Sequence, residues 1–202
     1  MHTVIASLMV LLIGSMAVFT ATDGLRAFTA EGARRLRVME RPIAVPNATL
    51  IDIEGKSVPL ASLQGKVVLV EFIYTTCPTI CQEMGSASFQ VMDSIRTRGL
   101  AEDVRLLSLS FDIDADTPKD LKTYGERHNA DEQIWRIMKP ATPQDLKRLL
   151  ELFGVTVIPD PVFKYQHNAA VHVISRDGRL VRIVDIAAQE AISAMLAEVV
   201  RP

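Results

Sequence analysis

The two cysteines of this 202-residue chain lie four positions apart, in a Cys-Pro-Thr-Ile-Cys segment at positions 77–81. They follow the apolar run Val67–Ile73, which is typical of a buried strand. Pro78 suits the first position of a helix, because its missing N–H would have no partner there. The pattern therefore predicts a strand followed by a helix over about residues 79–98, with Cys77 as its N-cap and Cys81 one turn later.

The four-residue spacing of the two cysteines suits the binding of one metal ion better than a disulfide, although both states can form. A thiol near the positive end of a helix has a lowered pKa, and the thiolate both binds metals and exchanges disulfides. Cβ atoms at helix positions i and i+4 lie about 5–6 Å apart, whereas a relaxed disulfide needs about 3.5–4.5 Å. A non-helical Cys77 brings the disulfide within reach. Two thiolates do not complete a metal site, so a third ligand must come from elsewhere.

Histidine is the natural third ligand, and His167 is the best placed of the four in the chain. It ends a proline-containing loop over residues 160–166, directly before the predicted strand Ala169–Ser175. His172 falls inside that strand, where we expect a packed or half-exposed side chain. His128 lies at the polar end of a predicted helix, where we expect it to be solvated.

Several acidic residues follow the predicted strand Val104–Phe111. A calcium loop that began at Asp112 would need Gly at its sixth position and Glu at its twelfth, but the chain has Thr117 and Thr123 there. We therefore interpret this segment as a strand end that leads into a helix cap. Asp112 is expected at the edge of the sheet where the cysteine-bearing helix begins, next to a site there.

The remaining pattern predicts one α/β domain, a central sheet with helices on both faces. Its turns include Glu-Gly-Lys at positions 54–56 and an Asp-Gly pair at 177–178, both typical of hairpins. Predicted helices begin near residues 79, 116, 142 and 187. The predicted strands are Leu50–Ile53, Val58–Leu60, Val67–Tyr74, Val104–Phe111, Ile134–Met138, Ala169–Ser175 and Leu180–Ile186.

Residues 3–22 carry no charge and match the roughly 20 residues that span a bilayer. The poor cleavage site around Ala21 favours an uncleaved transmembrane anchor over residues 1–24, rather than a cleaved signal peptide. Arg26, Arg34, Arg35 and Arg37 follow the span, and the positive-inside rule would hold them in the cytoplasm. We nevertheless expect a bacterial inner-membrane protein whose soluble part faces the periplasm, because its cysteine chemistry fits that compartment.

The composition limits the classes of function. A polar linker over residues 25–42 leaves residues 43–202 for one domain, which is long enough for a full hydrophobic core. The net charge is −2 and aromatic residues make up 5% of the chain. No basic stripe is present, so nucleic-acid binding has no support.

Three blocks in order resemble the Sco/SenC family, thioredoxin-fold copper proteins involved in assembling cytochrome c oxidase. The first runs from Gly65 through the strand to the Cys-Pro-x-x-Cys motif at 77–81. The second joins the Ser-Phe-Asp at 110–112 to the Asp-Thr-Pro at 116–118. The third is the His-Asn-Ala at 167–169, followed by the Asp-Gly at 177–178. The match covers nearly the whole of the predicted soluble domain.

The resemblance implies a thioredoxin-like sandwich with a mixed sheet and copper ligands at Cys77, Cys81 and His167. Many family members have Asp after the Cys-Pro pair and Pro after the second cysteine, where this chain has Thr79 and Gln82. These departures concern tuning and partner contacts, not the ligand set. Independently, soft thiolates favour Cu(I) and imidazole suits Cu(II), although zinc would accept the same ligands.

Two functions remain open, and only the second of them would be an enzyme activity. The first is a metallochaperone that takes copper from a donor protein and delivers it to the binuclear copper site of a cytochrome c oxidase subunit. The second is a thiol–disulfide oxidoreductase that reduces the cysteines of that oxidase site through Cys77 and Cys81. Because Cys81 lies one turn inside the helix, we expect Cys77 to be the more exposed thiolate of the two, as an attacking thiol must be. His167 stands where thioredoxin-type reductases have a substrate-docking proline, which favours metal binding.

Overall fold

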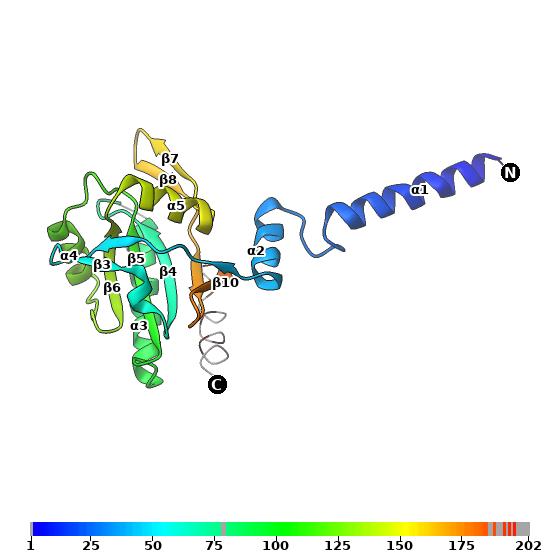
Figure 1. The fold of residues 1–202 in the computed structure, drawn as a ribbon. Coiled ribbons are helices and arrows are strands. Elements are labelled where there is room, and N and C mark those ends of the chain that lie inside the picture. The colour runs from blue at the N-terminus through cyan, green and yellow to red at the C-terminus, as the bar shows by residue number, and fades with distance from the viewer. Residues whose placement is uncertain are drawn as a thin grey trace. The chain divides into compact units, whose positions relative to one another are not determined.

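The structure, a computed structural model, describes residues 2–77, 80–185, 188, 192, 194 and 196. The chain divides into two units, residues 1–42 and 43–202. The first carries the N-terminal helices, and the second carries the sheet and the candidate metal ligands. Figure 1 shows the elements of both.

The first unit consists of α1 (His2–Ala21) and α2 (Ala30–Glu40). By length and composition α1 can cross a membrane, and none of its residues is buried. The segment expected to be a linker therefore contains a helix. On α2, Glu31 pairs with both Arg34 and Arg35 at 3.0 Å, so two of the arginines that follow the apolar helix have an acidic partner.

The second unit is built on a mixed sheet (Figure 1). In the part of the chain that the structure describes, eight strands are ordered β1-β10-β9-β4-β5-β6-β2-β3, with β4, β5 and β6 parallel and the other neighbours antiparallel. The strands are β1 (Ile43–Ala44), β2 (Thr49–Ile51), β3 (Ser57–Pro59), β4 (Val67–Ile73), β5 (Val104–Ser110), β6 (Trp135–Pro140), β9 (Val171–Ile174) and β10 (Arg179–Val184).

The centre of this sheet is covered on both faces. Every residue of β4 is buried, and so are six of the seven residues of β5. Neighbouring strand residues point to opposite faces, so continuous burial requires cover on both sides. Helix α3 (Ile80–Thr97) packs against β5, while α4 (Pro118–Arg127) and α5 (Pro143–Phe153) pack against β6. A short 3₁₀ helix, η1 (Leu60–Leu63), precedes β4.

The helix starts follow the predicted chemistry. Thr117 caps α4 in a capping box with Asp120, and Pro118 is the first helical residue. Thr142 caps α5 by accepting a hydrogen bond from the Asp145 N–H at 3.1 Å. These contacts satisfy N–H groups that have no partner inside the helix, so the sequence alone places both helix starts correctly.

Two other expectations have different outcomes. Most of the predicted final helix, Ala187–Val200, lies outside the described residues. The segment predicted as a loop over 160–166 instead belongs to a separate hairpin, β7 (Val157–Asp160) and β8 (Lys164–His167). Two prolines, at 159 and 161, hide its alternating pattern.

Glu71 places a carboxyl group inside the core of β4, where it is 0% exposed. Its oxygens accept hydrogen bonds from the Ser108 hydroxyl at 2.5 Å and the Ser88 hydroxyl at 2.8 Å. The Ser108 hydroxyl also accepts from the Trp135 indole N–H at 2.7 Å. Burial raises the pKa of Glu71 to about 7, because removal from water penalises the charged form more than the two hydroxyls stabilise it.

Candidate metal centre

The carboxyl ends of β4 and β5 meet at one edge of the sheet, and the candidate residues follow them there. The parallel register pairs Ile73 with Ser110, and the Phe111 N–H donates to the Ile73 carbonyl at 3.0 Å. Beyond β4 the chain turns back, because the Cys77 N–H donates to the Tyr74 carbonyl at 3.3 Å. Polar sites of α/β proteins commonly form at this edge of a sheet.

The structure describes Cys77 but leaves the exact start of the helix after it undescribed. Helix α3 is described from Ile80, and residues 78 and 79 lie outside the described part, so Cys77 as the N-cap stays a prediction. Cys77 itself is buried, at 5% exposure, and its exposure relative to Cys81 also stays a prediction. The turn closed on Tyr74 keeps Cys77 at the end of the sheet, away from solvent. Cys81 is the second residue of α3, and its side chain lies outside the described part.

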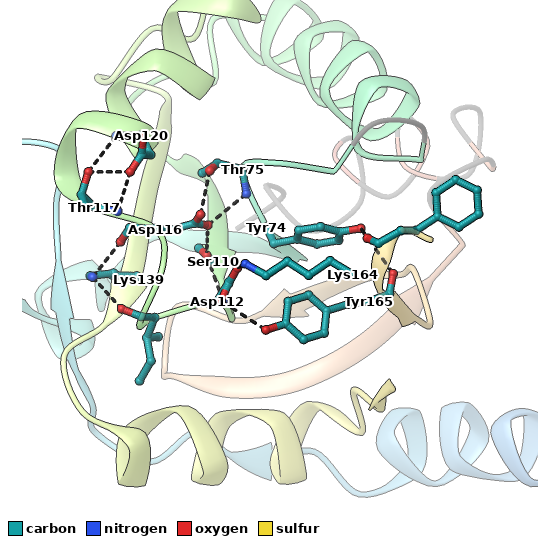
Figure 2. A network of polar contacts seen from close by, with 12 residues as sticks. Tyr74, Thr75, Ser110, Asp112, Asp116, Thr117, Asp120, Lys139, Lys164 and Tyr165 are labelled. Atoms are coloured by element: carbon teal, nitrogen blue, oxygen red, sulfur yellow. Dashed lines mark hydrogen bonds and ion pairs between the residues drawn. The ribbon is translucent and has the colours of Figure 1, made fainter. Parts of the chain in front are cut away.

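Asp116 holds the loop that carries Cys77. Its carboxylate accepts hydrogen bonds from the Thr75 N–H at 2.9 Å, the Thr75 hydroxyl at 2.7 Å and the Ser110 hydroxyl at 2.5 Å (Figure 2). The Lys139 ammonium donates to the Asp116 carbonyl at 2.7 Å. Asp116 is 1% exposed, so these bonds are shielded from water. The loop after β5 thus fixes the backbone two residues before Cys77.

His167, the last residue of β8, lies at the same edge. Its ring centroid is 5.0 Å from that of Phe111 and 6.4 Å from that of Tyr74. Nδ1 lies 3.3 Å from the Asn168 carbonyl. Nε2 is buried and has no hydrogen-bond partner among the described residues. Because Cys77 bonds to the Tyr74 backbone, Tyr74 brings Cys77 and His167 to one end of β4.

The state of His167 suits a metal ligand. Burial lowers the pKa of His167 below its usual range, so the ring is neutral at physiological pH. A neutral imidazole with a bare nitrogen is the form that binds metal ions. A buried polar atom without a partner is costly in a folded protein, and a bound metal ion would remove that cost. His167 is therefore in a state that can bind a metal ion at this edge.

The hairpin that carries His167 is attached to both strands beneath it. The Tyr74 hydroxyl donates to the carbonyls of Phe163 at 2.5 Å and Tyr165 at 3.3 Å. The Asp112 carboxylate pairs with the Lys164 ammonium and accepts from the Tyr165 hydroxyl at 3.3 Å (Figure 2). Asp112 lies at the edge predicted for it, with the hairpin as its partner.

The other histidines have structural environments. His172 is 1% exposed in β9, and its Nε2 lies 2.9 Å from the Phe153 carbonyl, so it is the packed strand residue of the two alternatives. We expected His128 to be solvated, but it is half-buried. Its ring centroid lies 4.7 Å from that of Tyr124. It also packs on the backbone of α3 at Gly85, where an added Cβ would lie 2.3 Å from the ring.

Sequence reasoning missed Lys164, Tyr165 and Asp116 as parts of this site. The pattern places Asp116 at a helix start, which explains its position but not its bonds to Thr75. Lys164 and Tyr165 fall in the segment predicted as a loop. Their contacts with Asp112 span more than 50 positions, so no local pattern signals them.

The chain resembles known proteins in sequence and in fold. The SCO1/SenC family model matches residues 40–201. The SCO1 protein homolog of Bacillus subtilis (strain 168) is 26% identical over 131 residues, 64% of this chain and 67% of that protein. ScoI of Bradyrhizobium japonicum, solved with copper bound, superposes with a TM-score of 0.64 at 24% identity and covers 78% of this chain and 99% of that one.

A further solved structure is that of BsSco, which is described as a member of the Sco family of cytochrome c oxidase assembly proteins with a disulfide switch. It gives a TM-score of 0.68 at 23% identity, over 79% of this chain and 92% of that one. These likenesses establish the predicted thioredoxin-like fold. The family match spans the whole sheet and the candidate site. The chain belongs to the SCO1/SenC family.

Proposed function

We propose that this chain binds one copper ion through Cys77, Cys81 and His167. The observation that carries the proposal is the buried Nε2 of His167, which has no partner in the described part of the chain and lies beside the residue that bonds to Cys77. Thiolates favour Cu(I) and imidazole suits Cu(II), so such a set holds both oxidation states. Zinc would accept the same donors, and the choice of copper rests on the family and its copper-bound members.

Copper is the cargo of this protein in our proposal. The chain accepts it from a donor protein and delivers it to the binuclear copper site of a cytochrome c oxidase subunit. Membership of the family supports this role, since BsSco is described as an oxidase assembly protein. The alternative role, reduction of the oxidase cysteines, needs an accessible attacking thiolate. Cys77 is buried, and His167 stands where thioredoxin-type reductases have a substrate-docking proline, so we favour delivery.

A cellular experiment separates the two roles. His167→Ala is expected to impair oxidase assembly under copper limitation as severely as Cys77→Ser, and added copper is expected to restore it in part. A reductase has no need of the imidazole, whereas copper transfer loses a ligand. Oxidase activity in membranes is the measurement, and Lys147→Met, which changes a solvent-exposed residue of α5, is the control. Normal activity of the His167→Ala strain would favour reduction and contradict delivery.

We also propose that residues 1–24 anchor the chain in the bacterial inner membrane, that 25–42 connect the anchor, and that 43–202 face the periplasm. The apolar helix α1 supports the anchor. The arginines after it oppose this orientation under the positive-inside rule, so the orientation needs a direct test. A reporter active only in the periplasm, fused after Pro202, is expected to be active. If this fusion is inactive and a reporter that works only in the cytoplasm is active, residues 43–202 face the cytoplasm and the proposed orientation is wrong.

A further inference from the structure

An ion pair joins the hairpin β7–β8 to the loop after β5. The Lys164 ammonium contacts Oδ2 of Asp112, and the two residues are 52 positions apart. The Asp112 side chain is 6% exposed, whereas that of Lys164 is 44% exposed. A buried carboxylate without a cationic partner is costly, so this contact stabilises the docked position of the hairpin. Figure 2 shows the pair beside Tyr74 and Tyr165.

The backbone of Lys164 is unusual for a lysine. Its φ is 69°, in the left-handed region that favours glycine at the end of a hairpin turn. Glycine would adopt this conformation without the steric cost that a side chain adds. Lysine therefore occupies a position where the turn alone favours another residue, and its side chain makes the contact with Asp112.

The hairpin has no buried residue of its own, and it is held by side-chain contacts with the sheet edge, where the Tyr165 ring also packs on Tyr74 at 5.4 Å and on Phe111 at 5.5 Å. No residue of β7 or β8 is buried, and Ile158 and Val162 are exposed at 57% and 76%. A two-stranded hairpin by itself is marginally stable in water. Its position therefore depends on its contacts with the sheet edge, which include the Tyr74 hydroxyl and the Asp112 carboxylate.

His167 is three residues after Lys164 on the same strand, so the position of one end of β8 affects the other. We propose that the Lys164–Asp112 ion pair is a latch that holds the hairpin on the sheet edge and thereby positions the His167 imidazole for Cu(II). Lys164 is a positioning residue: it acts through the strand and contacts no proposed ligand. The role in copper binding rests on the proposed function, whereas the attachment of the hairpin does not.

The test replaces Lys164 in the full-length chain purified in detergent. Lys164→Met keeps most of the aliphatic stem and removes the charge. In the metal-free protein, amide hydrogens of β7 and β8 are expected to exchange about tenfold faster, because the hairpin opens more often. The Cu(II) dissociation constant is expected to rise roughly 10–100-fold, as for other losses of ligand-orienting contacts, with a changed Cu(II) absorption spectrum.

Cu(I) affinity is expected to stay within about threefold of the unsubstituted protein, since the two thiolates hold Cu(I) without the hairpin. Lys164→Arg is expected to restore both exchange protection and Cu(II) affinity, because it keeps the charge. Lys147→Met is the matched control. It removes a lysine whose pair with Glu151 on α5 lies at 3.9 Å and is solvent-exposed, and it should change neither property.

The outcomes separate the latch from the copper site itself. Unchanged hydrogen exchange in Lys164→Met overturns the latch, whatever the metal binding. Faster exchange with unchanged Cu(II) affinity, in a protein whose Cu(II) binding requires His167, overturns the positioning role. If the unsubstituted protein binds Cu(II) without His167, the proposed copper site fails, and the exchange measurement still decides the latch. The double variant Asp112→Asn/Lys164→Met should exchange the amide hydrogens of the hairpin no faster than Lys164→Met alone. If the effects of the two substitutions add, the two residues do not act through a shared contact.

Discussion

Replacing His167 with alanine is expected to weaken Cu(II) binding by more than about 100-fold, because outer partners of ligands alone account for roughly 10–100-fold. The reason lies in the ligand types, since imidazole suits Cu(II) and thiolates favour Cu(I). Cu(I) affinity should therefore stay within about threefold, held by Cys77 and Cys81. The absorption and electron paramagnetic resonance spectra measure the Cu(II) complex, and competition with a chromophoric chelator measures Cu(I).

Two other histidine variants complete this test. His128→Gln should leave the Cu(II) spectrum intact, because His128 packs on Tyr124 and Gly85 and not on the proposed site. His172 is buried against the Phe153 carbonyl, so its substitution is expected to affect stability first. An intact Cu(II) spectrum in His167→Ala, together with its loss in a folded His172→Gln protein, would show that the ligand assignment is wrong.

Stability is expected to fall as the pH rises from about 4.5 to 7, by up to about 3 kcal/mol through Glu71 alone. The pKa of Glu71 is about 7 in the folded protein and 4.5 in an unperturbed side chain. Between these values the folded protein keeps a proton that the unfolded chain has released, so the free energy of unfolding decreases with pH. Above about pH 7 both states are ionised and this contribution is constant.

Glu71→Gln is expected to remove this dependence, because an amide fills the same space without titrating. The protein should then be more stable than the unsubstituted chain at pH 8, and nearly equal to it at pH 4.5. Urea unfolding followed by the fluorescence of Trp135, the only tryptophan, provides the measurement. Glu151→Gln, on the exposed face of α5, is the control. A pH profile that is the same in Glu71→Gln as in the unsubstituted protein would contradict a neutral buried carboxyl group.

The sequence by itself determined the elements that local chemistry specifies. Thr-Pro pairs at 117–118 and 142–143 provide a capping oxygen and a residue that suits the first helical turn, and both helices begin there. The continuous apolar run of β4 predicts a strand covered on both faces, and its end places Cys77 at the carboxyl edge of the sheet. These features depend on neighbours within a few positions, so they can be read without the fold.

The tertiary structure decided what lies around those elements. The β7–β8 hairpin was read as a loop, because its prolines and its left-handed Lys164 break the alternating pattern, and because its stabilising partners Tyr74 and Asp112 are distant in sequence. The burial of Cys77, and the lack of a partner for His167 Nε2 among the residues that the structure describes, likewise follow from packing. The type and spacing of residues indicate which side-chain atoms can bind a metal ion. The exposure, the partners and the pKa of those residues depend on segments that meet only when the chain folds.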